Sequence, residues 1–238
     1  MKRTKLQQYL AGMRAGVPVI FGFVPVGIAF AIMARQAGFS LMQTCGMSLC
    51  VFAGASQMMA AGMYGQGAGL AAIIFATFIL NLRHLIMSTC VMNRMKDGST
   101  GARLLAAFGV TDESFALFTT EKEENCFLPY FFGMITVTYS SWNVGTFIGA
   151  VASDFLPGII TASLGIALYA MFIGLLVPSL PGNGKLGALV LLTALCNTLL
   201  SRLMPASWAL ICSTLLCALI GTGFIDLNEG KEASHEES

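Results

Sequence analysis

Charged side chains are scarce in this sequence: Lys, Arg, Asp and Glu together make up 11% of its 238 residues. Hydrophobic residues make up 56%, and the mean hydropathy is +0.76, which excludes an ordinary soluble domain. The 13 basic and 12 acidic residues nearly balance, so the net charge does not indicate nucleic acid or another polyanion as a partner. The composition predicts an integral membrane protein in a lipid bilayer.

Metal-binding and redox motifs are also missing. The sequence has only two histidines, His84 and His235, too few for a common zinc site. None of the seven cysteines is followed by another at the two-residue spacing of zinc and thiol-redox motifs. We therefore expect no metal and no cofactor, and we interpret the cysteines as small packing residues.

Long apolar runs dominate what is present. Because lipid offers no water to an unpaired backbone, each run is expected to be helical, and the fold class is an all-α bundle of seven or eight transmembrane helices. Short connections predict a single membrane domain over residues 1–238, with a basic cytoplasmic N-terminus at 1–14 and an acidic tail at 226–238. The runs are 15–34, 41–63, 67–92, 103–118, 127–152, 157–180, 186–204 and 206–225.

The basic residues do not fit a chain that crosses at every run. Four of them precede the first run with no acid among them, which indicates a cytoplasmic N-terminus. Arg94, Lys96 and Arg103 follow the third run, where three crossings would place them outside. Either the positive-inside rule is broken, or one of the first three segments is re-entrant; the second, with its polar centre, is the candidate.

That second run contains FAGASQMMAAG, in which Gly54, Ser56 and Gln57 place a flexible, hydrogen-bonding patch inside an apolar segment. One interpretation is an unwound turn at mid-membrane that presents free backbone groups to a substrate, as in discontinuous helices of secondary transporters. The alternative is that Ser56 bonds back within its own helix and Gln57 bonds a neighbour.

The third run carries Asn81, Arg83 and His84 near its middle. Estimates for a charged residue at that depth begin at about 2.5 kcal/mol, so such a residue normally faces protein or water and has a partner. The nearest candidate partners are Asp112 and Glu113 in the next run. These groups predict a substrate or proton site between spans; the alternative is an ion pair that only locks two helices together.

The fourth run is short for a span, about 24 Å at helical rise, and holds GVTDESF. We expect Gly109 to break it and Thr111 to cap a half-helix whose first turn carries Asp112 and Glu113, where carboxylates are favoured. Adjacent residues point about 100° apart on a helix, so only one of the two acids is expected to face the site.

Two pairs of short segments suggest an internal repeat. Residues 25–27 (PVG) are similar to 143–145 (NVG), and Asn81 in the third run has a counterpart in Asn197 of the seventh. Transporters are often built from such halves.

The kinked-looking first span PVIFGFVPVGIAFA, then FAGASQ, NLRH and TDESFA, occur in an order that resembles the AzlC family of bacterial branched-chain amino-acid exporters. The resemblance covers most of the chain and is strongest from about residue 12 to 120. It implies an inner-membrane, multi-pass, proton-driven exporter of leucine, isoleucine, valine or methionine, working as the large subunit of a permease with a small AzlD-type membrane subunit. Gly145 and Gly149, four residues apart, are candidate contacts for that subunit, with an internal helix contact as the alternative.

The leading hypothesis is a transporter rather than an enzyme, because a zwitterionic amino acid needs a donor for its carboxylate and an acceptor for its ammonium group. The expected substrate-binding residues are Arg83, Asn81, Ser56, Gln57 and Asn143, and the expected proton-coupling residues are Asp112, Glu113 and His84. Two other functions stay open. One is an intramembrane serine hydrolase with Ser56 as nucleophile and His84 as base; the other is a non-catalytic assembly partner of another membrane protein.

Overall fold

A computed structural model describes residues 4–155, 173, 177 and 184–224, and these residues form helices and loops without a strand. The all-helical prediction is confirmed for them. They belong to two compact units, Met1–Ala170 and Met171–Ser238, which we describe separately. Most of the predicted run 157–180, the acidic tail and His235 lie outside the described residues.

Two helices in the described part of the chain are long and apolar enough to cross a membrane, α1 (Lys5–Gln36) and α4 (Leu70–Arg94). Helix α1 continues through Pro18 and Pro25, although each proline removes one backbone hydrogen bond. Its N-terminus is closed by a capping box between Thr4 and Gln7. Helix α7 (Leu128–Ala152) has the same length as α4.

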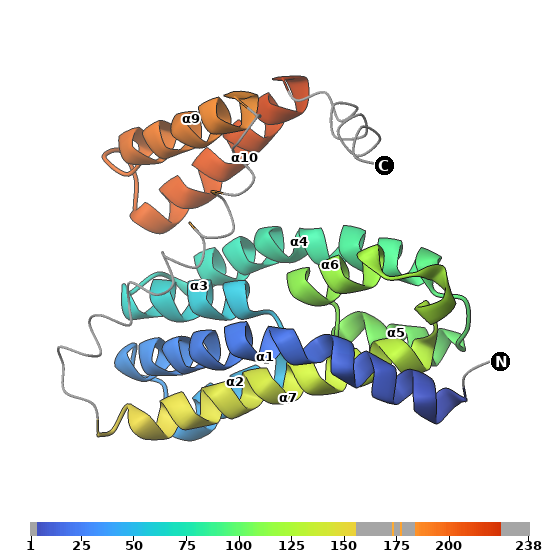
Figure 1. Ribbon diagram of the computed structural model, residues 1–238. Coiled ribbons are helices and arrows are strands. Elements are labelled where there is room, and N and C mark those ends of the chain that lie inside the picture. The colour runs from blue at the N-terminus through green and yellow to red at the C-terminus, as the bar shows by residue number, and fades with distance from the viewer. Residues whose placement is uncertain (1–3, 156–172, 174–176, 178–183, 225–238) are drawn as a thin grey trace. The chain divides into compact units, whose positions relative to one another are not determined.

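Helices α1 and α7 lie side by side over most of their length and run parallel (Figure 1). Gly12 lies against Tyr130, Gly27 lies against Trp142, and Arg35 reaches Ser153, so contacts advance together along both helices. The approach is very close: a Cβ added at Gly12 would lie 1.9 Å from the Tyr130 carbonyl oxygen. Glycine permits this packing because it lacks a side chain.

Glycines of α7 serve the same contact. A Cβ added at Gly145 or Gly149 would lie 2.5 Å from the carbonyl oxygen of Val24 or Ile28 in α1. The internal alternative is therefore correct for this pair, and the interpretation of Gly145 and Gly149 as contacts for a second subunit is wrong, because α1 already covers them.

The second predicted run is not one helix. It forms α2 (Leu41–Cys50) and α3 (Gly54–Gly65), separated by residues 51–53. A break is therefore present in this run, but it precedes the predicted patch, since Gly54, Ser56 and Gln57 are helical. Helix α2 starts next to the end of α1, and a Cβ added at Gly65, the last residue of α3, would lie 3.1 Å from the Cβ of Ala37. The chain thus leaves and returns at the same end of α1, and we call Leu41–Gly65 the first hairpin.

The fourth predicted run is also broken, as expected at Gly109. It forms α5 (Thr100–Phe108) and α6 (Asp112–Thr120), separated by residues 109–111. Arg103 in α5 bonds the carbonyls of Met92 and Met95, and Arg94 bonds the carbonyl of Glu121 just after α6. This second hairpin, Thr100–Thr120, therefore begins and ends beside the C-terminus of α4.

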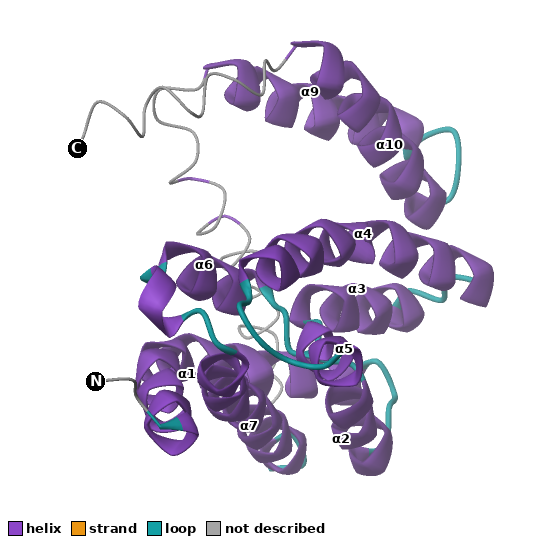
Figure 2. Ribbon diagram, turned by 90° about the vertical axis from the view of Figure 1, so that its right-hand side faces the viewer, coloured by secondary structure: helices purple, strands orange, loops and turns teal. Residues whose placement is uncertain are grey.

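The two hairpins occupy opposite ends of the first unit, and α4 passes along both of them (Figure 1). The first hairpin lies at the end where α1 stops and α4 starts. The second lies at the end where α4 stops and α7 starts, since the Lys96 N–H donates to the Cys126 carbonyl at 3.0 Å. Seen along the helices, both hairpins are next to the α1–α7 pair (Figure 2).

The broken segments meet halfway along α7, at a group of aromatic rings. The Phe52 ring lies 5.2 Å from that of Tyr139 and 6.5 Å from that of Phe108, and Phe108 lies 6.0 Å from Tyr139. Gly54, the first residue of α3, packs on the ring of Trp142. We call Phe52, Phe108, Tyr139 and Trp142 the central aromatic group.

This path accounts for the basic residues after the third run. Arg94, Lys96 and Arg103 lie at the end of the unit where α1 begins, because the first hairpin returns to the end from which it started. The geometry agrees with the re-entrant alternative for the second segment, and the positive charges then obey the positive-inside rule.

The second unit contains two described helices, α9 (Gly184–Leu200) and α10 (Ala206–Phe224), joined by residues 201–205. Gly221 packs on Leu189, and the Ser213 hydroxyl donates to Asn197 Oδ1 at 3.4 Å, so the two helices run antiparallel. Asn197, the proposed counterpart of Asn81, thus has a partner inside its own helix pair.

The re-entrant path makes a topology prediction that can be tested with single cysteines in a cysteine-free background. Lys96→Cys and Lys5→Cys should react with a membrane-impermeant thiol reagent from the same face, and Gln66→Cys from the opposite face. A permeant reagent that labels all three is the control. Reaction of Lys96→Cys from the Gln66 face would refute the hairpin.

The α1–α7 contact makes a stability prediction with a matched control on one helix. Gly12→Ala should lower the free energy of unfolding of the detergent-solubilised protein by at least about 1–3 kcal/mol, because the added Cβ has no room. The melting temperature should fall accordingly. Gly22→Ala meets nothing within 4 Å and should be neutral or stabilising, since alanine is the better helix former. Equal melting temperatures for the two variants would contradict the close contact.

Candidate functional site

An ion pair inside the first unit joins Arg83 of α4 to Asp112 of α6. The Arg83 Nη2 atom lies 2.9 Å from Asp112 Oδ2, and each side chain is 38% exposed. Arg83 is one residue from the midpoint of α4, so the pair lies far from both ends of that helix. The predicted partnership of the basic and acidic clusters is therefore present, and both side chains are partly exposed.

The structure also distinguishes the two acids. Asp112 is the first residue of α6 and makes the ion pair, whereas Glu113 interacts with the Thr111 side chain and lies within electrostatic range of both Arg83 and Asp112. Thr111 is the N-cap: its hydroxyl accepts from the Ser114 N–H at 3.3 Å, and Ser114 Oγ accepts from the Thr111 N–H at 2.8 Å. This capping box confirms the predicted start of the half-helix.

His84 is held at the same break. Its Nδ1 lies 2.9 Å from the carbonyl oxygen of Val110, one of the three residues between α5 and α6. A carbonyl can only accept, so Nδ1 carries the proton in this geometry. The imidazole thereby satisfies a backbone oxygen that the break leaves without a helical partner.

Several buried polar atoms near the breaks have no hydrogen-bond partner among the described residues. They belong to side chains of α3, α4 and α7 that surround the broken segments. The atoms are Gln57 Oε1, Asn81 Oδ1, Arg83 Nε, His84 Nε2 and Trp142 Nε1. Because an unpaired buried polar atom is costly, these atoms are candidate contacts for a ligand.

The predicted polar patch of the first hairpin divides in two. Ser56 Oγ donates to the Ala53 carbonyl at 2.9 Å, so the alternative in which Ser56 bonds back locally is correct. Gln57 is fully buried and donates to Ser48 Oγ at 3.0 Å, and Ser48 lies 2.8 Å from Thr146 Oγ1 of α7. Gln57 therefore both bonds a neighbouring helix and keeps its amide oxygen unpaired.

The two asparagines differ in their local contacts. Asn81 lies on α4, two residues from Arg83, with its unpaired oxygen. Asn143 donates from Nδ2 to the Tyr139 carbonyl one turn earlier in α7, a bond within its own helix. Asn143 is nonetheless adjacent to Trp142 of the central aromatic group.

The serine-hydrolase alternative needs Ser56 and His84 to share a hydrogen bond. Within the described residues, Ser56 bonds Ala53 and His84 bonds Val110, in different hairpins, and no bond joins them. The geometry gives no support to a nucleophile and base at these positions.

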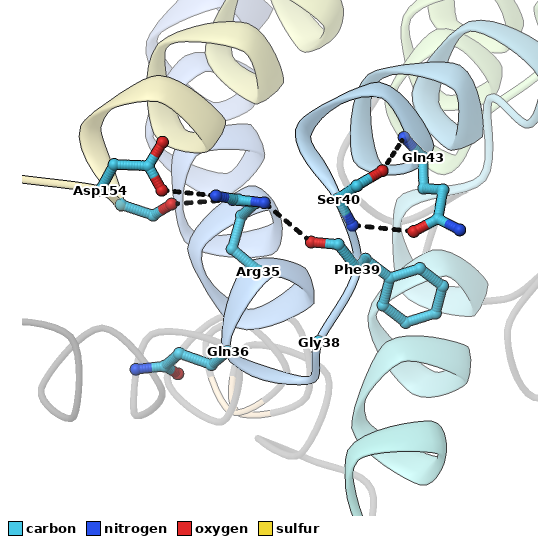
Figure 3. Close-up of a pocket in the computed structure, with 8 residues that line it drawn as sticks. Arg35, Gln36, Gly38, Phe39, Ser40, Gln43 and Asp154 are labelled. Atoms are coloured by element: carbon cyan, nitrogen blue, oxygen red, sulfur yellow. Dashed lines mark hydrogen bonds and ion pairs between the residues drawn. The ribbon is translucent and has the colours of Figure 1, made fainter.

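A polar pocket that the sequence did not indicate lies where α1 and α7 end. It has a volume of about 340 Å³ and is lined by Arg35, Phe39, Ser40, Gln43 and Asp154, among others. Figure 3 shows Arg35 between Asp154, at 2.5 Å, and the carbonyl of Phe39, at 3.1 Å. One guanidinium thus joins the last turn of α1, the end of α7 and the entry to the first hairpin. The signal was a basic residue in the last turn of a helix.

A third ion pair, Lys96–Glu123 at 3.0 Å, lies on the surface beyond the apolar segments. Its hydrogen bond and the lysine charge lower the pKa of Glu123, which is otherwise exposed. Exposed pairs contribute little to stability. This pair serves as a control for Arg83–Asp112.

Comparison with known proteins gives consistent matches. The family model described as AzlC protein matches residues 18–156, which run from within α1 to just past the end of α7. An uncharacterized membrane protein of Archaeoglobus fulgidus is 33% identical over 76% of this chain and 80% of its own length. The inner membrane protein YgaZ of Escherichia coli is 30% identical over 72% and 73%.

A further relative is named for its transport role. The branched-chain amino acid transport protein AzlC of Bacillus subtilis is 28% identical over 66% of this chain and 62% of its own length. No solved structure matches the chain significantly.

Proposed function

Because this chain belongs to the AzlC protein family, as its motifs predicted, we propose that it exports branched-chain and related hydrophobic amino acids across the bacterial inner membrane. The family and the name of the Bacillus subtilis relative support membrane transport of such substrates. The names of two other relatives support a membrane location.

The observation that carries the proposal is the Arg83–Asp112 pair. An amino acid has a carboxylate and an ammonium group on one carbon, and this pair offers a cation and an anion to match them. Arginine holds a carboxylate with two parallel hydrogen bonds, and Arg83 Nε is unpaired. A bound amino acid would separate the two side chains and pair with each of them, so no charge would be left alone.

The same pair supplies a route to proton coupling. The substrate ammonium needs Asp112 in its ionised form, and a protonated Asp112 cannot receive it. A proton and an amino acid would then compete for the Asp112 carboxylate. This competition would couple the inward movement of a proton to the outward movement of an amino acid. Glu113 follows Asp112 in the first turn of α6 and is the second candidate proton carrier. His84 is the rival proton carrier.

We also propose that the chain is the large subunit of a two-component permease with a small AzlD-type membrane subunit. The apolar face of α4 supports a helical partner or lipid there, since Ile74, Phe78 and Ile86 are at least 58% exposed within the described structure. Helix association in lipid depends on packing rather than on a hydrophobic drive, so it should be specific. Flux should therefore be measured with the chain alone and with the small subunit, and full activity of the chain alone would contradict this part.

The test of the site is efflux of labelled leucine from loaded proteoliposomes that contain Arg83 variants. Arg83→Gln should reduce flux at least tenfold, because a lost charge-assisted hydrogen bond costs about 1.5–3 kcal/mol, or about 10- to 150-fold. Arg83→Lys should restore little, since an ammonium is a point charge without the planar fork.

Lys96→Gln is the matched control for the Arg83 variants. It removes the cation of a surface ion pair at the end of the same helix, and flux should stay at the wild-type rate. Wild-type flux from a correctly inserted Arg83→Gln protein would refute the assignment. Loss of that variant from the membrane would instead identify the ion pair as a structural lock.

Proton coupling predicts separate phenotypes for the acids. Asp112→Asn should lose leucine exchange across vesicles without a pH gradient as well as accumulation driven by an imposed gradient, because a neutral amide, like a protonated carboxyl, cannot pair with the ammonium group. Glu113→Gln should have a milder effect, because Glu113 does not make the ion pair. His84→Gln should keep gradient-driven transport. If His84→Gln loses gradient-driven transport while Asp112→Asn keeps it, His84 rather than Asp112 is the proton carrier.

A further inference from the structure

The two hairpins are built on the same plan, although their sequences are not obviously alike. In each, a long helix ends with an arginine in its last turn, a glycine with positive φ follows, and a serine caps a short helix. These elements are Arg35, Gly38 (φ 98°), Ser40 and α2 in the first copy, and Arg94, Gly98 (φ 108°), Ser99 and α5 in the second.

The plan continues beyond the caps. Helix α2 has 10 residues and α5 has 9, and each is followed by a break of three residues, 51–53 and 109–111, and by a second short helix. An aromatic ring belongs to each break or precedes it directly, Phe52 in one and Phe108 in the other. The matched unit is therefore a long helix followed by a broken hairpin: residues 5–65 and residues 70–120.

The two units have opposite directions in the molecule. Helix α1 ends at the first hairpin, whereas α4 starts there and ends at the second hairpin. The two units thus have inverted orientations, and each hairpin extends from its own end of the first unit toward the middle, where the two breaks lie (Figure 1). This is a different repeat from the one that residues 25–27 and 143–145 suggested.

The breaks meet at the central aromatic group, and the polar groups lie around the same place. Phe108 immediately precedes the second break and Asp112 immediately follows it, so one break carries an apolar and a charged contact. At the first break, α3 starts without a side-chain cap, and the fully buried Gln57 nearby has an unpaired amide oxygen. An ammonium group is the partner that such an oxygen lacks.

We propose that residues 5–65 and 70–120 are inverted copies of one unit and that the transported amino acid binds between their two breaks. Its apolar side chain lies against Phe52, Phe108 and Tyr139, and its charged groups lie against Arg83 and Asp112. The first hairpin closes this site from one face of the membrane, and the second closes it from the other. The identity of the ligand rests on the proposed function, whereas the two gates rest on the geometry of the hairpins.

The geometry of the hairpin ends permits a direct test. In a cysteine-free chain, Ala37→Cys and Gly65→Cys would bring two Cβ atoms to about the separation of a disulfide, given a shift of a few tenths of an ångström. Oxidation would fix the end of α3 to the end of α1 and hold the first hairpin shut. Leucine flux should fall at least tenfold on oxidation and return on reduction, while each single variant stays active.

A second tether controls for cross-linking itself. Gly16→Cys with Val137→Cys joins α1 to α7, where the added Cβ of Gly16 lies 3.3 Å from that of Val137. This bond restrains neither hairpin, so flux should not change on oxidation. Full flux through a completely cross-linked Ala37–Gly65 protein would overturn the gate.

A labelling measurement separates failure of the gates from failure of the proposed function. A cysteine at Ala53, in the first break, should react with an impermeant reagent from both faces in the reduced protein. After prior cross-linking of positions 37 and 65, it should react only from the face of the second hairpin. If this labelling pattern is seen but the reduced protein transports no leucine, the two gates are supported and leucine is not the substrate. If cross-linking leaves the labelling two-sided, or if neither face is labelled, the gates are refuted.

Discussion

Backbone hydrogen bonding at mid-depth is the constraint on which this structure depends. A helix that stops inside an apolar layer leaves carbonyls and N–H groups without partners, and lipid supplies none. Side chains supply them here: Tyr139 donates to the Leu49 carbonyl at the first break, and His84 pairs with the Val110 carbonyl at the second. Thr111 and Ser114 close the start of α6. The residues that make the breaks tolerable are thus the ones that surround the candidate site.

This dual use explains why residue chemistry alone does not separate structural from transport roles. Arg83 and Asp112 lock α4 to α6 and at the same time present complementary charges that are 38% exposed. A lock that is partly open to a ligand can be exchanged for that ligand at little cost, because each charge keeps a partner. A fully buried pair would favour the purely structural interpretation.

Much of the fold was predictable because the signals were local. The break at Gly109, the cap at Thr111 and the unwound segment before Gly54 follow from glycine, capping residues and polar groups within a few positions of one another. The misplaced positive charges indicated a re-entrant segment because they report on the sidedness of the chain. The matching plan of the two hairpins was not predictable, since it lies in helix lengths and glycine φ angles rather than in shared side chains. The Arg35–Asp154 pair joins residues 119 apart, and although the position of Arg35 in the last turn of α1 is a local signal, no local pattern identifies Asp154 as its partner.

The parallel contact between α1 and α7 has a consequence for biosynthesis. Gly12 and Tyr130, which touch, are separated by 118 positions in the chain. At a translation rate of about 5–20 residues per second, the ribosome makes Tyr130 roughly 6–24 s after Gly12. During that interval Gly12, Gly16 and Gly27 lack the cover that α7 later gives them, so this part of the fold forms only after α7 has been made.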